Sequence, residues 1–212
     1  MTRLLLVRHG RSVWNSLGRI QGQFDIELDD EGVRQAQRVA ARVGQLDIAA
    51  IYSSPLQRAR VTAEMIGAQV NLPVTCDDRL MEYQFGVVSG LTWDELVVQH
   101  PELAKRWADD AWTVPIEGSE GRVVFAARVK AAMDDIIARH PDQQVAVVAH
   151  GGTFNVYLAR MLGLDLKRRH PFHFGNTSLS SLEVKNGVFS VHFLNDMCHL
   201  KTADLWQRVG GA

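Results

Sequence analysis

Two histidines of the chain stand beside glycines, each at the point where an apolar run of residues stops. The run before His9 lies near the start of the chain, and the run before His150 lies in its second half. In an open α/β sheet, the residues just past the carboxyl ends of parallel strands meet in one crevice, where ligands bind. A third run stops shortly before Arg58. The spacing therefore predicts that both histidines, Arg8 and Arg58 gather in one cleft that suits a phosphate group.

These residue types can divide the cleavage of a phosphate ester into two easier steps. His9 is the candidate nucleophile, because an imidazole with one nitrogen held by a hydrogen bond can attack with the other. Arg8 and Arg58 are the candidate clamps, since the planar guanidinium matches phosphoryl oxygens, and His150 is expected to be a second cationic donor. Glu82 is a carboxylate that can protonate the leaving group and later activate water.

Other residues are candidates for holding the substrate. Asn15 offers an amide donor one short turn beyond His9. Gly151 follows His150 directly, and Gln21 and Gly22 are candidate ligand contacts, although turn chemistry explains this pair almost as well. We expect no cofactor and no metal, because the positive charges of the cleft would take the place of Mg²⁺.

A metal site elsewhere is also not expected. Four histidines lie late in the chain, but neither cysteines nor carboxylates stand near them at the spacing of a zinc site. These histidines are His170, His173, His192 and His199. Packed or surface positions explain them better.

The composition of the chain excludes several classes of function. Its 212 residues carry a formal charge of -1, which gives no field for nucleic acid or an anionic membrane. The single compact basic run, residues 167–170, fits the solvated end of a helix. Cys76 and Cys198 give no disulfide framework, and no stretch has the length of a signal-peptide core or a membrane span. We therefore expect one cytoplasmic domain over residues 1–212.

The periodicity of the apolar residues alternates between strand and helix. We expect strands over residues 3–8, 48–53 and 144–149, and helices over 29–43, 56–68, 122–139 and a stretch beginning after the double glycine 151–152. This alternation indicates a parallel sheet covered on its faces. Asn186-Gly187 between two β-prone runs predicts a hairpin, which would add an antiparallel strand. Its edge strand leaves pairing into a homodimer open.

The middle of the chain, about residues 82–121, breaks this rhythm. It holds Trp93, Trp107 and Trp112 and shows little strand signal. We expect a mostly helical excursion over one end of the sheet, too short to form an independent domain. Its tryptophans are expected to be packing anchors, with lining of the substrate space as the alternative.

Several ordered motifs resemble those of the histidine phosphatase superfamily, in its phosphoglycerate-mutase-like branch. They run from Arg3 to about Leu194 and comprise RHGRSVWN at 8–15, GRIQGQFD at 18–25, SSPLQRA at 53–59, LME at 80–82 with Gly86 and Gly90, AHGG at 149–152 and NTS at 176–178. The chain departs from the family pattern at Arg11, at Val88 and over residues 115–120. Val88 in place of a frequent tryptophan is expected to enlarge or soften the floor of the cap. Arg11 is expected to face solvent, with added positive charge at the mouth of the pocket as the alternative.

The resemblance implies a three-layer α/β/α sandwich, with a mostly parallel sheet, an antiparallel edge strand and a helical cap over the site. It also implies that the residue matching His9 becomes transiently phosphorylated. Arg8, Arg58 and His150 would bind the phosphoryl group, and Glu82 would shuttle the proton.

Three functions remain open on the sequence. The first is a metal-independent phosphomonoesterase acting on a small phosphorylated metabolite, with phosphoserine as the runner-up specific substrate, because residues 195–200 are similar to the ending of metal-independent phosphoserine phosphatases. The second is a phosphoglycerate mutase, disfavoured because residues 86–93 lack a lysine found in such proteins. The third is a non-catalytic phosphate-binding module.

Overall fold

One sheet forms the centre of the protein in the computed structural model, which describes residues 1–110, 115–166 and 172–200. Over these residues the strand order is β3-β2-β4-β1-β5-β6. The strands are β1 (Thr2–Arg8), β2 (Ala50–Ser53), β3 (Val74–Cys76), β4 (Gln144–Ala149), β5 (Leu179–Lys185) and β6 (Val188–Asp196). The first four are parallel to one another, whereas β5 runs antiparallel to β1 and to β6. The predicted antiparallel strand is therefore β5, and β6 forms the edge.

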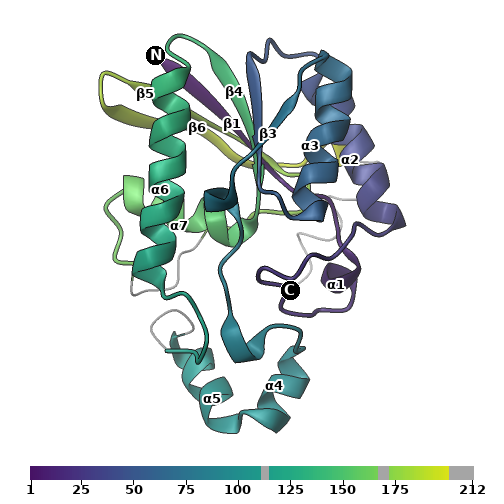
Figure 1. The fold of residues 1–212 in the computed structure, drawn as a ribbon, viewed down its shortest axis with the longest axis vertical. Helices are drawn as coiled ribbons and strands as arrows, with labels where there is room; N and C mark the ends of the chain where they lie inside the picture. The colour runs from purple at the N-terminus through teal and green to yellow at the C-terminus, as the bar shows by residue number, and fades with distance from the viewer. Residues whose placement is uncertain (111–114, 167–171, 201–212) are drawn as a thin grey trace.

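Helices cover both faces of this sheet (Figure 1). α2 (Asp30–Val43) and α3 (Gln57–Val70) lie on one face, and α6 (Arg122–Arg139) and α7 (Gly151–Met161) lie on the other. The remaining helical segments are α1 (Val13–Ser16), α4 (Trp93–Gln99), α5 (Pro101–Asp110) and short 3-10 turns at Asp78–Leu80, Gly86–Val88 and Cys198–Leu200. The predicted three-layer α/β/α class is confirmed. None of the helices within the described ranges is long and apolar enough to cross a membrane.

The central strand β1 is buried on both faces, which explains its unbroken apolar run. Leu4 and Leu6 pack into the core beneath α6 and α7, while Leu5 and Val7 pack into the core beneath α2 and α3. Burial of side chains of this size stabilises the fold by about 2 kcal/mol each. The strand that carries His9 at its end is thus held rigidly from both sides.

The register of the sheet places three strand ends side by side. Arg8 on β1 pairs with Ala149 on β4, and Ser53 on β2 pairs with Val148 on β4. The residues that follow, His9, Ser54 and His150, therefore lie at one edge of the sheet, as the strand-end pattern predicts.

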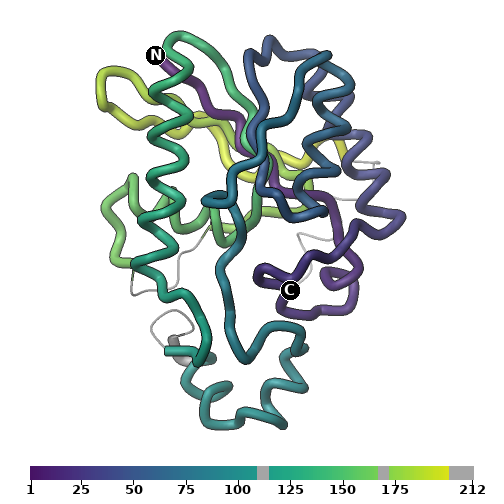
Figure 2. The backbone as a smooth tube through the Cα atoms, viewed as in Figure 1, coloured from purple at the N-terminus to yellow at the C-terminus, as the bar shows by residue number. Residues whose placement is uncertain are grey.

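α4 and α5 lie beyond this edge, apart from the sheet layers (Figures 1 and 2). They enclose a small core of their own, made of Val88, Leu96, Ala104 and Ile116. Val88 is fully buried there. It therefore packs inside the cap and does not enlarge a floor open to ligand. Trp107 stacks near Phe85, and Trp93 is about half exposed; Trp112 lies outside the described residues.

Several element boundaries differ from the sequence prediction. α7 begins at Gly151 itself, with His150 as its N-cap, and not after the double glycine. α3 runs on to Val70 and ends at Asn71, whose left-handed backbone (φ 55°) stops it. β2 begins at residue 50, not 48. The short strand β3 was not expected from the sequence. The basic run at residues 167–170, expected to end a helix, lies outside the described residues. The predicted hairpin is confirmed, with Asn186 and Gly187 both at positive φ.

Candidate active site

A cavity of about 220 Å³ opens at the carboxyl ends of β1 and β2, under the cap. Its lining comes from the strand ends, from the loop after α1 and from the cap: Arg8, His9, Asn15, Arg19, Ile20, Gln21, Gly22, Arg58, Glu82, Phe85 and Trp107. Every candidate site residue of the sequence analysis is on this wall except His150 and Gly151. His150 lies directly behind it, with its ring centroid 5.1 Å from that of His9.

His9 is held so that one ring nitrogen is left for a ligand. Its Nδ1 lies 2.7 Å from the carbonyl oxygen of Gly10. A carbonyl only accepts, so Nδ1 carries the hydrogen and Nε2 keeps its lone pair. Burial lowers the pKa of His9 well below its usual value, with the nearby charges of Arg58 and Arg8 acting in the same direction. The ring is therefore neutral, which is the state a nucleophile requires.

The two arginines are buried with part of their donors satisfied by backbone. Arg58 donates from its terminal nitrogens to the carbonyls of Phe24 and Gly22, each at 2.7 Å, and Arg8 donates to the carbonyl of Phe174. Burial lowers the pKa of Arg58 to about 10 and also lowers that of Arg8, while the charge of Glu82 opposes both shifts. Both groups remain cationic at neutral pH.

His150 is fully buried, and its Nε2 lies 2.8 Å from the hydroxyl of Ser54. Burial lowers its pKa well below the usual value, and the charges of Arg58, His9, Arg8 and Arg128 add to the shift. In this environment the neutral imidazole is favoured over the cation expected from the sequence. Burial among fixed positive charges disfavours a further one.

Three buried nitrogens around the cavity have no hydrogen-bond partner in the structure. They are Nε of Arg8, Nε of Arg58 and Nδ1 of His150. Buried donors without partners are rare and costly, and each calls for an explanation. Their three side chains come from β1, α3 and the start of α7, and they also repel one another. A tetrahedral oxyanion would satisfy both the charge and the unused donors.

Glu82 approaches the same group of side chains from the opposite side. Its carboxylate accepts hydrogen bonds from the backbone N–H of Gly152 at 2.9 Å and of Tyr83 at 2.8 Å. A Cβ added at Gly152 would lie 2.2 Å from a Glu82 oxygen. The second glycine of the 149–152 motif is therefore required for the approach of this carboxylate to α7.

The loop that carries Glu82 is anchored by Arg128 on α6. Arg128 donates to the carbonyls of Arg79, Met81 and Glu82 at 2.7–2.9 Å, and it pairs with Glu120 at 2.6 Å. Both partners of this ion pair are mostly buried, at 17% and 14% exposure. Arg128 thus fixes the backbone from which the carboxylate projects.

The substrate-binding candidates form a connected polar wall. The Asn15 side-chain oxygen accepts from Ser12 and, at 3.2 Å, from Asn176, which also donates to the carbonyl of His9 at 3.1 Å. Gln21 accepts from the Ser12 hydroxyl at 2.7 Å. These contacts use the amide oxygens of Asn15 and Gln21, so their NH₂ groups remain as donors. Gly151 lies behind the wall, against the Arg8 guanidinium.

Ser54, Asn176 and Arg128 were missed as supporting residues. The first two lie in stretches that the motif resemblance covers, but their contacts cross 96 and 167 positions of the chain. No local pattern signals such contacts. Arg11, by contrast, adds no charge to the cavity wall: it is 41% exposed, as expected, and its Nε pairs with Asp29 at 2.6 Å.

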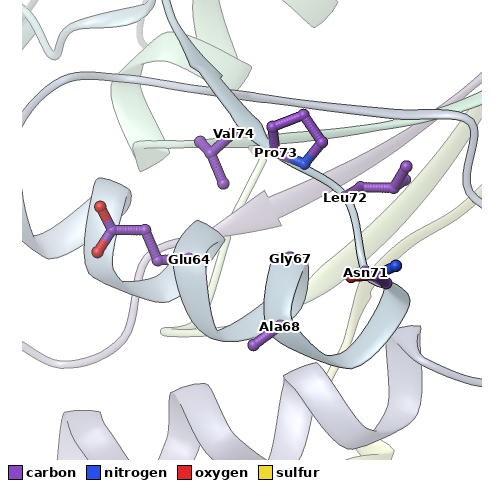
Figure 3. Close-up of a pocket in the computed structure, with 7 residues that line it drawn as sticks. All are labelled: Glu64, Gly67, Ala68, Asn71, Leu72, Pro73 and Val74. Carbon is purple, nitrogen blue, oxygen red and sulfur yellow. The ribbon is translucent and has the colours of Figure 1, made fainter.

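The other surface cavities found in the described part of the chain are not lined by such a cluster of buried arginine and histidine side chains. The one beside the end of α3 has about 540 Å³ and is lined by Glu64, Gly67, Ala68, Asn71, Leu72, Pro73 and Val74 (Figure 3). Within the described ranges, no group of three or more His, Cys, Asp or Glu residues is placed to hold a metal ion, and Cys76 and Cys198 are free.

Comparison with known proteins identifies the family of the chain. Residues 4–197 match the model of the histidine phosphatase superfamily (branch 1). The chain belongs to this superfamily, and it is a phosphoric monoester hydrolase.

Individual relatives are similar over nearly the whole chain. Phosphoserine phosphatase 1 of Hydrogenobacter thermophilus is 34% identical, over 94% of this chain and 95% of the relative. A probable phosphoglycerate mutase, GpmB of Erwinia tasmaniensis, is 32% identical over 97% and 98%. The structure of a mutant phosphoserine phosphatase from Entamoeba histolytica in complex with phosphoserine superposes with a TM-score of 0.82, at 30% identity over 95% of this chain and all of that one.

Proposed function

We propose that this protein hydrolyses the phosphate monoester of a small metabolite through a phosphohistidine at His9, without a metal ion. The observation that carries the proposal is the set of three unpartnered nitrogens, on Arg8, Arg58 and His150, beside a neutral imidazole with a free Nε2. A bound phosphoryl group would receive these donors while its phosphorus faces the nucleophile.

In the first step, Nε2 of His9 attacks phosphorus, so that a P–N bond forms as the P–O bond to the leaving group breaks. The departing oxygen takes a proton from the carboxylic acid form of Glu82. Arg8 and Arg58 neutralise the charge on the phosphoryl oxygens, which is the task that Mg²⁺ performs in many other phosphoryl-transfer sites.

In the second step, the Glu82 carboxylate removes a proton from a water molecule, whose oxygen attacks phosphorus. The P–N bond breaks, its electron pair returns to His9, and inorganic phosphate leaves. One carboxyl group thus serves as acid and then as base, which requires that it keep its position in both steps. The hydrogen bonds from Gly152 and Tyr83 to its oxygens support that requirement.

The size of the cavity favours a compact substrate. About 220 Å³ accommodates a phosphoryl group and a short carbon chain. Ile20, Phe85 and Trp107 form its apolar side, and the free amide donors of Asn15 and Gln21 form a polar side. Phosphoserine is the specific substrate that we place first, because two of the similar proteins are named phosphoserine phosphatases and one binds phosphoserine.

A phosphoglycerate mutase is the second candidate function, because a relative at 32% identity carries that name. A mutase returns the phosphoryl group to an organic acceptor, whereas a phosphatase gives it to water. Absence of a lysine from residues 86–93 favours the phosphatase.

The test is a panel of phosphorylated metabolites that includes phosphoserine, 3-phosphoglycerate and p-nitrophenyl phosphate, compared by kcat/KM with and without EDTA. We expect phosphate release, unchanged by EDTA, with phosphoserine among the best substrates. Interconversion of phosphoglycerates faster than phosphate release would replace the proposal by the mutase. Binding of phosphate with no turnover on any ester would leave only a phosphate-binding module.

We also propose a cytoplasmic location and no cofactor. The free thiols of Cys76 and Cys198 fit a reducing compartment. The cation cage of the cavity supplies the charge stabilisation for which a cofactor or metal would otherwise be needed.

A further inference from the structure

Ser54 is a fully buried residue whose hydroxyl group contacts the imidazole of His150. The Oγ–Nε2 distance is 2.8 Å, and both residues are completely inaccessible to solvent. The backbone N–H of Ser54 donates to the Val148 carbonyl at 3.0 Å, which fixes the serine to β4, the strand that His150 follows directly. The contact is therefore held by the rigid sheet and not by a loop.

The hydrogen bonds around Ser54 decide which partner donates. Its Oγ also accepts from the backbone N–H of Leu56, at 3.3 Å. A second lone pair would still allow Oγ to accept from Nε2 of His150, but the hydroxyl hydrogen would then have no acceptor among the described residues. Donation from Oγ to Nε2 satisfies that hydrogen, so we take Ser54 as the donor. A neutral imidazole that accepts at Nε2 carries its hydrogen at Nδ1, and Nδ1 is the unpartnered nitrogen of this residue.

We propose that Ser54 is a positioning residue that holds neutral His150 in the Nδ1–H tautomer, so that a buried N–H is available to the phosphoryl group without an extra charge. This inference rests on the proposed function of the cavity. Without the serine hydroxyl, neutral His150 can place its hydrogen on Nε2, and a lone pair at Nδ1 would then face the anion and repel it.

The charges around His150 favour a neutral hydrogen-bond donor at this position. The charged and titratable groups near its ring are Arg8 from β1, His9 after β1, Arg58 from α3 and Arg128 from α6. The Glu82 carboxylate lies beside α7 through its bond to Gly152. Since three arginines disfavour a further cation there, a neutral donor costs less than an imidazolium.

The test compares Ser54→Ala with two matched variants. Ser54→Thr keeps the hydroxyl, and Ser53→Ala removes an equally buried neighbouring hydroxyl that bonds only to the Ser54 carbonyl at 2.8 Å. The tautomer of His150 is determined from the imidazole ¹⁵N chemical shifts, assigned with a His150→Gln variant. The Kd of inorganic phosphate is measured by calorimetry at about pH 8 and about pH 5.5, on either side of the usual imidazole pKa.

We expect the Nδ1–H tautomer in the wild type and a shift towards Nε2–H in Ser54→Ala. Phosphate binding should weaken about 10-fold at the higher pH, the range of one hydrogen bond, and only about 2-fold at the lower pH. The loss shrinks because the bound anion raises the pKa of His150 back towards its usual value, so that at the lower pH the ring in the complex is doubly protonated and always has an N–H at Nδ1. Ser54→Thr and Ser53→Ala should bind phosphate like the wild type.

An equal loss at both pH values would indicate a purely structural role and overturn the inference, as would the same loss in Ser53→Ala. Should Ser54→Ala not fold, the wild-type spectrum alone decides, since an Nε2–H tautomer there contradicts the inference. Phosphate binding with the Nδ1–H tautomer but without ester hydrolysis would refute the proposed function and leave this inference standing.

Discussion

Around the cavity, the key nitrogen-bearing side chains each have part of their hydrogen-bonding capacity committed to the protein and part left over. His9 uses Nδ1 on Gly10, His150 uses Nε2 on Ser54, and Arg58 uses both terminal nitrogens on backbone carbonyls. The committed atoms fix the orientation, and the remaining nitrogens are left as donors or acceptors for a ligand. This division is what preorganised binding of a transition state requires.

The role of Glu82 as proton donor leads to a prediction about leaving groups. Glu82→Gln removes the acid, so esters of poorly acidic alcohols such as phosphoserine should slow by about 10²–10⁴-fold. p-Nitrophenyl phosphate should lose far less in formation of the phosphoenzyme, because p-nitrophenolate hardly needs protonation. The measurement is burst and steady-state kinetics on both substrates. Glu64→Gln, which changes an exposed carboxylate on α3, is the control; equal losses on both substrates would remove Glu82 from this role.

The depressed pKa of His9 sets the acid side of the pH–rate profile. Protonation of Nε2 would abolish the nucleophile, but burial and the charges of Arg58 and Arg8 move that protonation to lower pH. We therefore expect kcat/KM to stay level through the usual imidazole pKa of about 6.5 and to fall only well below it. A profile that drops around that value, after correction for ionisation of the substrate phosphate, would contradict a neutral, caged His9.

At the scale of single residues, the candidate catalytic residues can be predicted from the sequence, whereas the contacts that support them cannot. His9, Arg58 and Glu82 are predictable because their types and motifs carry a reaction. The support from Asn176 to the His9 carbonyl and from Arg128 to the Glu82 loop is not, since each joins segments that are far apart along the chain. The lowered pKa of His150 is not predictable for the same reason, because burial depends on the whole packed site.

At the scale of elements, the junction of α7 with the Glu82 loop leaves no room for a side chain at Gly152. Gly152→Ala would place a methyl group 2.2 Å from Oε1 of Glu82, which accepts from the Tyr83 N–H, and 3.0 Å from Oε2, which accepts from the Gly152 N–H. We expect the carboxylate to be displaced and turnover of phosphoserine to fall at least about 10-fold, although alanine by itself favours a helix.

A double-mutant cycle separates this effect from general damage. In a Glu82→Gln background, Gly152→Ala should cost much less, because the group that it displaces has already lost its function. Thermal unfolding of each variant checks that the fold is retained. Strictly additive losses would show that Gly152 acts independently of Glu82.

The elements were predictable where burial leaves a strong local pattern. β1, β2 and β4 have continuous apolar runs because helices cover both faces of the sheet, and the Asn-Gly turn defines the hairpin. β3 was missed because only Val74 of its three residues, Val74–Cys76, is even partly buried and the strand follows a proline, so that it shows neither pattern. α7 begins earlier than expected, and the Glu82 carboxylate, 70 positions away in the chain, accepts from the Gly152 N–H in its first turn, a contact that no local pattern shows.

At the scale of the whole molecule, a chain with a formal charge of -1 keeps a cluster of cations buried at one end of its sheet. Such a cluster costs folding free energy until an anion occupies it. We expect inorganic phosphate to raise the Tm, and to raise it further as the phosphate concentration exceeds the Kd, as for any ligand that binds the folded state alone. Differential scanning calorimetry with sulfate-free and phosphate-containing buffers measures this effect, and an unchanged Tm at millimolar phosphate would contradict an anion site.

Acid should destabilise the fold through the same buried histidines. The pKa values of His9 and His150 lie well below 6.5 in the folded protein, and that of His199, mainly through burial, falls to about 4. The unfolded chain therefore binds protons first as the pH falls, and the free energy of unfolding should decrease from about pH 6.5 downwards. Urea unfolding between about pH 7 and pH 5 tests this. His199→Asn should flatten part of the slope; a slope of opposite sign would contradict neutral buried imidazoles.

The most direct measurement is rapid-quench trapping of the phosphoenzyme with ³²P-labelled substrate in the wild type, His9→Ala and His150→Ala. We expect an acid-labile, base-stable label on the wild-type protein, located at His9 by peptide mapping. His9→Ala should lose this label and all turnover while still binding inorganic phosphate. A burst of phosphate release or an undiminished label in His9→Ala would contradict an imidazole nucleophile at the end of β1.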